Sequence, residues 1–301
     1  MFSILFPYSY VAIAFGLLIG IGLTVVTLGC MSAALGLVLI YTGILRITPV
    51  IDFLTKLLNI LLPEQVKQIQ NNIKESFKVR FTETIADGKY IYAWHPHGII
   101  SMSHFFHILT RFTDWPTKLQ PIKCTTLSIL TWLPFGKELF EYVSAVPSEY
   151  HAMKRALENG GSISVAVGGM REMLGNDYIV KRRRGIFKMA LETGTPIIPV
   201  ISFGENKLFS MIEISPPIQD FLEPYDICVC IPKFHSIYKW LGILHNPLKD
   251  PITSVVGTPI LVAKTAEPTE ADIAELRERY IAALKELFTN NPNKNEKFSV
   301  I

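Results

Sequence analysis

The sequence predicts an α/β fold, in which a mostly parallel β-sheet with flanking helices follows a membrane-embedded or transmembrane helical hairpin. From Lys89 onward, short β-branched runs alternate with helical stretches, which is the pattern of a parallel sheet with crossover helices. Before that point, residues 1–45 contain no charged residue and no histidine, in a chain of 301 residues that is 49% hydrophobic. The chain therefore divides into an apolar N-terminal part and an α/β part.

The N-terminal part is predicted to enter the membrane. A spanning helix needs about 20 apolar residues, so residues 1–45 are long enough for two short spans, and we favour a hairpin over one long span. A signal peptide fits less well, because no basic region precedes the apolar run. Arg46 and Lys56 follow it closely and favour a cytosolic location for the rest of the chain.

Two further regions follow the hairpin. Residues 46–80 are predicted as a membrane-proximal amphipathic segment, which lies either on the membrane or on the main domain. Its apolar positions recur at helical spacing: Val66, Ile69, Ile73 and Phe77. Residues 81–301 are predicted as the main domain, facing the cytosol.

The elements of the main domain can be read in order. Strands are expected at 90–94, 162–167, 196–203, 226–231 and 254–262, where β-branched and aromatic residues cluster. Helices are expected at 101–112, at 149–158 with Ser148 as N-cap, and at 185–193 with Gly194 as its stop. A last helix begins near Pro268, with an apolar face formed by Ile273, Leu276, Tyr280, Leu284 and Leu287. Residues 290–301 are expected to form a loose polar tail.

The richest chemistry lies where the first of these strands ends. His95-Pro96-His97-Gly98 follows the run 90–94, so a turn holds two histidines at the carboxyl end of a buried strand, where α/β folds place their ligands. Histidine suits proton transfer near neutral pH, and we therefore predict His97 as a general base. His104 and His107 lie in the same window, and His-x-His spacing permits a metal. We favour no metal, because the window holds no Asp or Glu and the other histidines are isolated; His104 and His107 are expected to be structural.

Two other segments complete the candidate site. Gly168 and Gly169 follow the strand 162–167, so their backbone N–H groups are candidates to hold an oxyanion, and Glu172 is a candidate to orient a histidine. The alternative is a simple turn with a solvated Arg–Glu pair. Arg182, Arg183 and Arg184 precede a helix start, which suits phosphate groups such as those of coenzyme A. A basic patch drawn to anionic lipid explains the three arginines equally well.

Other function classes find little support. Cys30, Cys124, Cys228 and Cys230 have no metal-like or redox spacing. A net charge of +3 is too small to argue for nucleic acid. The closest approach to a serine nucleophile elbow, residues 160–164, lacks the second glycine of Gly-x-Ser-x-Gly.

These blocks together resemble the type-2 diacylglycerol acyltransferase family, which also contains monoacylglycerol and wax-alcohol acyltransferases. The likeness rests on His95-Pro96-His97-Gly98, on Val167-Gly168-Gly169 with Glu172, on the block from Arg183-Arg184-Gly185 to Phe203-Gly204-Glu205-Asn206, and on residues 251–260 with the helix that follows. It covers roughly residues 90–288 in the same order. This chain departs from the family at Ile186, where an aromatic residue is usual, and at Met170-Arg171, where small residues are usual.

The resemblance implies an acyltransferase-like fold and an acyl-CoA-dependent O-acyltransferase of neutral lipid synthesis, which acylates diacylglycerol to triacylglycerol. Monoacylglycerol or a long-chain alcohol is the alternative acceptor, and a non-catalytic membrane protein is the alternative class. His97 would be the base, oriented by Glu172 directly or through His95, with backbone N–H groups of Gly98, Gly168 or Gly169 at the oxyanion. A phospholipid-type acyltransferase is disfavoured, because Ile100 and Met102 stand where its His-x-x-x-x-Asp spacing needs an aspartate.

The same resemblance implies acyl-CoA as co-substrate without a further cofactor, and an endoplasmic reticulum membrane or lipid-droplet location with the main domain facing the cytosol. The lipid bilayer and a lipid alcohol are the expected partners, with no nucleic acid. A homo-oligomer stays open as an alternative to a monomer.

Overall fold

The computed structural model of the chain describes residues 48–98, 101–110, 112–119, 121–128, 136–169, 172, 178–212, 231–233, 241–290 and 298–300. The predicted hairpin of residues 1–45 lies outside the described residues, as does the predicted strand 226–231 apart from Ile231. None of the helices in the described ranges has the length and apolar character needed to cross a membrane. The chain forms two compact units, one of Met1–Thr55 with Ile129–Tyr142, the other of Lys56–Ser128 with Val143–Ile301.

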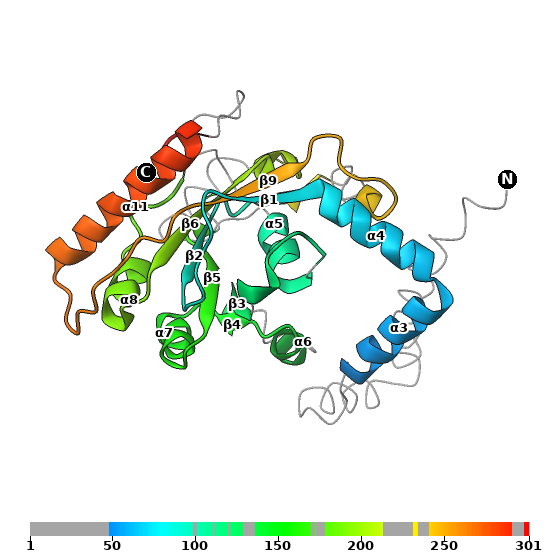
Figure 1. Cartoon of the computed structure of the whole chain (residues 1–301), viewed down its shortest axis with the longest axis horizontal. Helices are drawn as coiled ribbons and strands as arrows, with labels where there is room; N and C mark the ends of the chain where they lie inside the picture. Colours follow the sequence, from blue (N-terminus) through cyan, green and yellow to red (C-terminus); the bar gives the residue numbers. More distant parts are fainter. Residues whose placement is uncertain are drawn as a thin grey trace. The chain divides into compact units, whose positions relative to one another are not determined.

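A seven-stranded sheet forms the centre of the larger unit, in the order β1-β9-β6-β2-β5-β3-β4 (Figure 1). All neighbouring strands in it are parallel except β6 and β9, so the prediction of a mostly parallel sheet is confirmed. The strands are β1 (Phe77–Phe81), β2 (Ile91–His95), β3 (Ile122–Thr126), β4 (Val146–Pro147), β5 (Ser162–Ala166), β6 (Ile197–Phe203) and β9 (Ile252–Val256). A separate antiparallel pair joins β7 (Met211–Ile212) to β8 (Ile231–Pro232).

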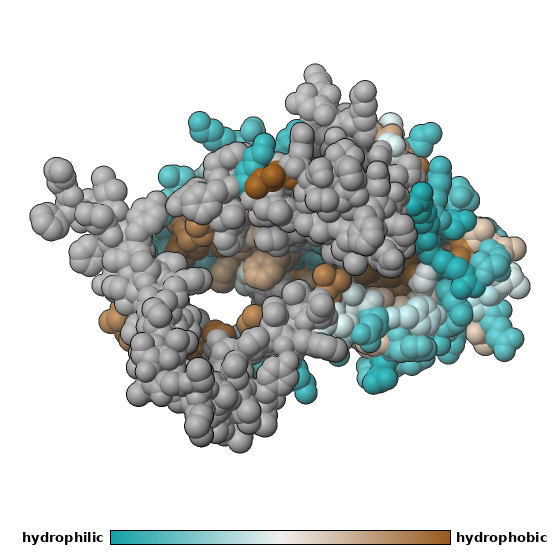
Figure 2. Space-filling model, turned by 180° about the vertical axis from the view of Figure 1, so that it is seen from behind, coloured by the Kyte–Doolittle hydropathy of each residue, from teal (hydrophilic) through white to brown (hydrophobic). Residues whose placement is uncertain are grey.

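Helices flank this sheet, as the sequence predicts for an α/β fold. The helices of the larger unit are α4 (Pro63–Ser76), α5 (Met102–Phe105), α7 (Tyr150–Glu158), α8 (Gly185–Thr193) and α11 (Glu270–Asn290). The smaller unit contains α6 (Gly136–Tyr142) and the first part of α3 (Thr48–Leu61). A π-helical turn, η1 (Phe106–Thr110), continues α5. A largely hydrophilic surface is visible on the right of Figure 2, the side of the larger unit where Figure 1 places α8 and α11.

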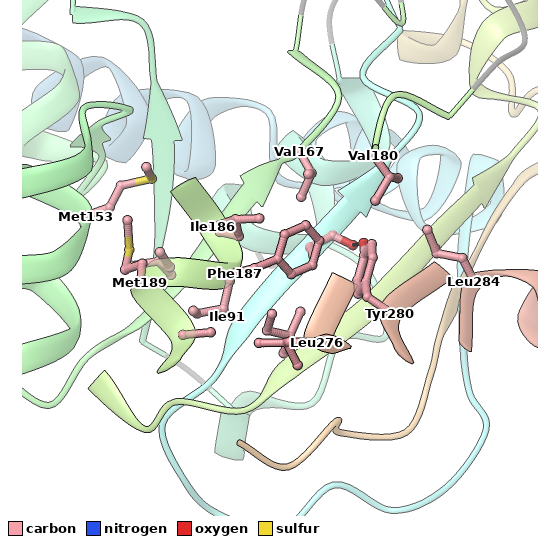
Figure 3. Packing of buried hydrophobic residues seen from close by; sticks show 14 of the residues in the cluster. Ile91, Met153, Val167, Val180, Ile186, Phe187, Met189, Leu276, Tyr280 and Leu284 are labelled. Atoms are coloured by element: carbon pink, nitrogen blue, oxygen red, sulfur yellow. Dashed lines mark hydrogen bonds between the residues drawn. The ribbon is translucent and has the colours of Figure 1, made fainter. Parts of the chain in front are cut away.

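The core has two main layers, because β2 is buried on both faces. Ile91 and Ala93 point to the layer covered by α7, α8 and α11, where Phe187 and Tyr280 pack together (Figure 3). Tyr92 and Trp94 point to the opposite layer, against the segment that follows α5. Alternation of side chains along a strand produces this division. The strand that carries the histidine turn is therefore fixed on both sides by large apolar side chains.

Several predicted elements match the structure closely. Helix α8 spans Gly185–Thr193 and ends at Gly194, whose φ of 61° lies in the left-handed region that glycine favours. The five predicted apolar positions of α11 are all buried, which fixes the side of the helix that packs on the sheet. The predicted helix at 101–112 consists of α5 and the π-helical turn η1.

Other expectations differ from the structure. Ser148 is not the N-cap of α7, since the helix begins at Tyr150 with Glu149 as its cap residue and no capping side-chain bond. Phe77 belongs to β1 and not to the helical stripe, because pairing with β9 overrides the helical spacing, and β1 crosses the boundary drawn after residue 80. Residues 298–300 are not loose: Tyr178 and Val300 form a parallel bridge.

Candidate active site

The histidine turn begins at the end of β2, between β5 and β6. His95 is the last residue of the strand and is fully buried, while His97 is only partly buried. The turn needs a special backbone conformation at Gly98, whose φ is 59°, and the peptide bond between His95 and Pro96 is cis. Neighbouring parallel strands hold β2 in register, so the position of the turn is set by the sheet.

A buried carboxylate joins the two histidines. Glu172 Oε1 lies 2.6 Å from His95 Nδ1, and its Oε2 accepts a hydrogen bond from the backbone N–H of His97 at 2.9 Å. The N–H of Ile179 donates to Oε1 at 2.8 Å. Glu172 is fully buried, and such a carboxylate needs hydrogen-bond donors in place of water. Glu172 thus contacts the ring of His95 but only the backbone of His97.

These contacts assign the protons on both rings. A carboxylate accepts hydrogen bonds, so His95 donates from Nδ1 and its lone pair is on Nε2. His97 Nδ1 lies 2.7 Å from the carbonyl oxygen of Gly98, which also accepts only, so its lone pair is on Nε2 too. His95 Nε2 is buried and has no hydrogen-bond partner among the described residues. His97 is the partly exposed histidine of the two.

The glycine pair lies against the same carboxylate. A Cβ added at Gly168 would lie 1.8 Å from Cδ of Glu172, so the close approach of Glu172 requires glycine there. Gly169 has a φ of 61°, which also favours glycine. Met170 and Arg171, the two residues between the pair and Glu172, lie outside the described residues.

The three predicted arginines have different surroundings. Arg183 donates from Nη2 to the carbonyl oxygen of Gly168 at 2.5 Å, which ties it to the glycine pair. Arg184 forms an exposed ion pair with Glu270 at the start of α11. Arg182 is exposed. The structure therefore brings one of the three to the histidine–carboxylate site.

Two tyrosines flank His95, and sequence reasoning gave neither a functional role. The ring of Tyr178 meets that of His95 edge-on at 5.7 Å, and the ring of Tyr280 lies 6.0 Å away. The hydroxyl of Tyr280 donates to the carbonyl oxygen of Ala93 at 3.2 Å. Burial, and then the charge of Glu172, raise the pKa of Tyr280 well above 10. Tyr280 was predicted only as part of an apolar helix face, and no local pattern marks Tyr178.

The other two histidines of the window lie on the opposite face of β2. The rings of His104 and His107 stack on Trp94 at 5.0 and 6.0 Å. Burial lowers the pKa of each from 6.5 to about 3, so both are neutral near pH 7. In the described parts of the chain, no three His, Cys, Asp or Glu side chains gather as metal ligands would. The rings of His104 and His107 thus pack against Trp94, and a structural role for both stays a prediction.

Sequence reasoning also missed a role for Glu205, which follows β6. Its carboxylate accepts hydrogen bonds from the backbone N–H groups of Met102 at 2.7 Å and Ser103 at 3.2 Å. Burial raises the pKa of Glu205 from 4.5 to about 7, although these donors favour the charged form. The available signal was a glutamate directly after a buried strand and a glycine.

Fold and site together define an α/β protein with a histidine–carboxylate centre at the end of its central strand. The chain belongs to the diacylglycerol acyltransferase family, since the model of that family matches residues 64–300. The resemblance inferred from the histidine turn and the blocks after it is thereby confirmed.

Named relatives agree with this membership. Diacylglycerol O-acyltransferase 2 of Xenopus tropicalis is 29% identical over 243 residues, which cover 73% of this chain and 66% of the relative. For 2-acylglycerol O-acyltransferase 1 of Homo sapiens the identity is 31% over 225 residues, with 68% and 66% covered. The chain thus spans slightly less than two thirds of the length of these curated relatives.

A solved structure is also similar, that of the 1-acyl-sn-glycerophosphate (LPA) acyltransferase PlsC from Thermotoga maritima. Its sequence is 15% identical, the TM-score is 0.46, and the match covers 86% of this chain and 97% of the other.

Proposed function

We propose that this protein is an acyl-CoA-dependent O-acyltransferase of neutral lipid synthesis, which transfers an acyl group to the hydroxyl of diacylglycerol. The proposal rests on Glu172, whose carboxylate fixes the ring of His95 and the backbone of His97 at the end of β2. Family membership supports it, with relatives named for acylation of diacylglycerol and of 2-acylglycerol. Monoacylglycerol and long-chain alcohols are the alternative acceptors.

In the proposed mechanism His97 is the general base. Its Nε2 takes the proton of the acceptor hydroxyl while that oxygen attacks the thioester carbonyl carbon of acyl-CoA. Backbone N–H groups of Gly98, or those of Gly168 and Gly169, stabilise the negative oxygen of the tetrahedral intermediate. The carbon–sulfur bond then breaks, and the proton held by His97 neutralises the leaving thiolate. The base must reach the substrate, and partial exposure favours His97 over His95.

His95 has a positioning role in this mechanism. Its Nε2 is buried without a partner, whereas its Nδ1–H holds the carboxylate of Glu172. Glu172 in turn holds the backbone N–H of His97. The orienting contact proposed between Glu172 and the base therefore acts through the backbone of the turn.

The acyl donor and the membrane are the proposed partners. Arg182, with Arg183 and Arg184, precedes the N-terminus of α8, where side-chain charge and backbone N–H groups suit the phosphates of coenzyme A. A thiolate leaves readily, so the proposed reaction requires no further cofactor. The uncharged run of residues 1–45 supports an endoplasmic reticulum membrane or lipid-droplet location. Helix α3 supports it too, because none of its residues is buried and Phe53, Ile60 and Leu61 are more than half exposed.

The test uses microsomes from a host that makes no neutral lipid, supplied with labelled acyl-CoA and diacylglycerol, monoacylglycerol, a fatty alcohol or a sterol in parallel. Wild type is expected to label one or more acceptors. His97→Ala should lose about 10²–10⁴-fold in turnover, the usual contribution of a general base. His151→Ala is the matched control, since His151 is exposed on α7, and it should keep wild-type turnover.

Asparagine variants separate the two histidines. An asparagine amide can donate to Glu172 much as Nδ1 does, but it cannot serve as a base near neutral pH. His95→Asn should therefore retain far more turnover than His97→Asn. The reverse order would make His95 the base. Near wild-type turnover in His97→Ala would overturn the assignment of His97 as the base while acyl transfer itself stands. No labelled product from wild type in any acceptor would favour the non-catalytic class of membrane protein.

A further inference from the structure

Residues 298–300 lie beside Tyr178 and Ile179, the two residues next to the carboxylate of Glu172 and the ring of His95. The backbone N–H of Tyr178 donates to the carbonyl oxygen of Ser299 at 2.8 Å, and Tyr178 forms a parallel bridge with Val300. Tyr178 is almost fully buried. Two parts of the chain that are far apart in sequence thus meet next to the histidine turn.

Aromatic rings continue this contact to the histidine itself. The ring of Phe298 lies 5.5 Å from that of Tyr178 and 5.3 Å from that of Phe288 on α11. The ring of Tyr178 meets His95 edge-on at 5.7 Å. Phe288 also lies 5.7 Å from Phe203 at the end of β6, which anchors the group to the sheet. One tyrosine therefore separates Phe298 from His95.

The backbone gives a second connection from residues 298–300 to Glu172. Ile179 follows Tyr178, and its N–H donates to Glu172 Oε1, the same oxygen that contacts His95 Nδ1. Tyr178 is held by Ser299 on its backbone and by Phe298 on its ring. If the contacts with Phe298 and Ser299 are lost, Tyr178 is no longer fixed, and the adjacent N–H of Ile179 can move away from Glu172.

We infer that residues 298–300 are a positioning segment of the active site, which keeps Tyr178 and Ile179 in place for Glu172 and His95. This inference rests on the proposed function. The segment touches neither reacting atom, so its loss should misplace the carboxylate while leaving the acyl-CoA site in place. A misplacement of about 1 Å can cost about 10²-fold in turnover.

The test compares kcat and KM for acyl-CoA, each per folded molecule, in wild type and four variants. Truncation before Phe298 and Phe298→Ala should lower kcat by about tenfold or more, with KM for acyl-CoA changed less than about twofold. Phe298→Tyr keeps the ring and should restore most of kcat. Ser299→Ala is the matched control, because the carbonyl oxygen and not the hydroxyl of Ser299 binds Tyr178, and its kcat should equal that of wild type.

The outcomes separate this inference from the proposed function. If His97→Ala is inactive and Phe298→Ala has wild-type kcat, the positioning role is wrong while the acyltransferase proposal stands. If His97→Ala is active, the assignment of His97 as the base is wrong while acyl transfer stands, and the Phe298 variants still test the positioning role. If wild type labels no acceptor, the proposed function fails and this inference fails with it. If the truncated protein does not fold, the comparison of Phe298→Ala with Phe298→Tyr decides. The inference would also be overturned if Phe298→Ala and Phe298→Tyr lost kcat equally, or if Phe298→Ala raised KM for acyl-CoA and left kcat unchanged.

Discussion

Gly168 is the residue where side-chain size decides whether Glu172 can reach the histidines. A Cβ there would lie 1.8 Å from Cδ of Glu172, a distance that no two carbon atoms without a bond can share. Glu172 would have to turn away, and its hydrogen bonds with His95, His97 and Ile179 would break. The close approach of Glu172 thus explains why glycine is required at position 168.

Gly168→Ala should therefore reduce acyl transfer more than it reduces stability. We expect turnover to fall by about 10²-fold or more, from loss of the positioned carboxylate. The free energy of unfolding should fall by about 1–3 kcal/mol, the usual cost of overpacking. Labelled-product assays and thermal unfolding measure the two effects. Gly242→Ala is the control, since a Cβ there meets nothing within 4 Å, and wild-type turnover in Gly168→Ala would contradict the prediction.

Glu205 gives the stability of the protein a predictable pH dependence. Burial raises its pKa in the folded protein to about 7, whereas an unfolded chain has a pKa near 4.5. Between these values the folded state holds a proton that the unfolded state has lost. Its contribution to the free energy of unfolding is therefore fully present below the unfolded pKa and decreases as the pH rises towards 7.

Glu205→Gln removes this titration, and the test is the difference in free energy of unfolding between wild type and variant. From about pH 5 to about pH 7 the difference should shift against wild type by roughly 1–3 kcal/mol. His104 and His107 titrate equally in both proteins and cancel. Denaturant unfolding in detergent at several pH values measures the shift. A difference independent of pH would show that Glu205 does not change its charge in this range.

At the scale of elements, α11 shows how a single helix face secures both the core and the site. Ile273, Leu276, Tyr280, Leu284 and Leu287 are all buried, while Glu278, Lys285 and Glu286 on the other side are exposed. The same helix provides Tyr280 to the carbonyl of Ala93 and Phe288 to the aromatic group near His95. Packing of α11 and placement of β2 are therefore coupled.

Leu284→Ala should destabilise the protein by about 2–5 kcal/mol, because a fully buried leucine leaves a cavity that the core cannot fill. Glu286→Ala, at an exposed position two residues away, should change the free energy of unfolding by less than about 0.5 kcal/mol. Thermal unfolding of the two variants in the same detergent measures both. Equal stabilities would show that α11 contributes little to the core.

At the scale of the whole molecule, elements with strong local signals could be predicted from the sequence. The left-handed glycine after α8, the apolar face of α11 and the aromatic strand before the turn each depend on neighbouring residues only. Contacts between distant segments could not be predicted in the same way. The position of β1 depends on β9, and the order of residues 298–300 depends on Tyr178.

The site shows the same division. That a histidine, a glutamate and a glycine pair lie together follows from their places at the ends of strands and from the family resemblance. Which atoms are in contact depends on the conformation of the turn. Glu172 hydrogen-bonds to the ring of His95 but only to the backbone N–H of His97. Ile179 enters the site through its backbone N–H, a contact that carries no residue-type signal. Tyr178 meets His95 through its ring, but no local pattern in the sequence marks that tyrosine. Arg183 was predicted for coenzyme A, and its contact with the carbonyl oxygen of Gly168 was not expected.

The pairing of β1 with β9 has a consequence for how the protein is made. Phe77 pairs with Ile252, so the edge of the sheet stays open until most of the chain has left the ribosome. At about 5–20 residues per second this interval lasts on the order of ten seconds or more, during which Phe77 and its neighbours are exposed. His95 likewise lacks its carboxylate partner until Glu172 has been synthesised. A nascent chain of this protein therefore needs protection from aggregation throughout most of its synthesis, and an interrupted translation product contains the histidine turn without the pairing that completes the sheet.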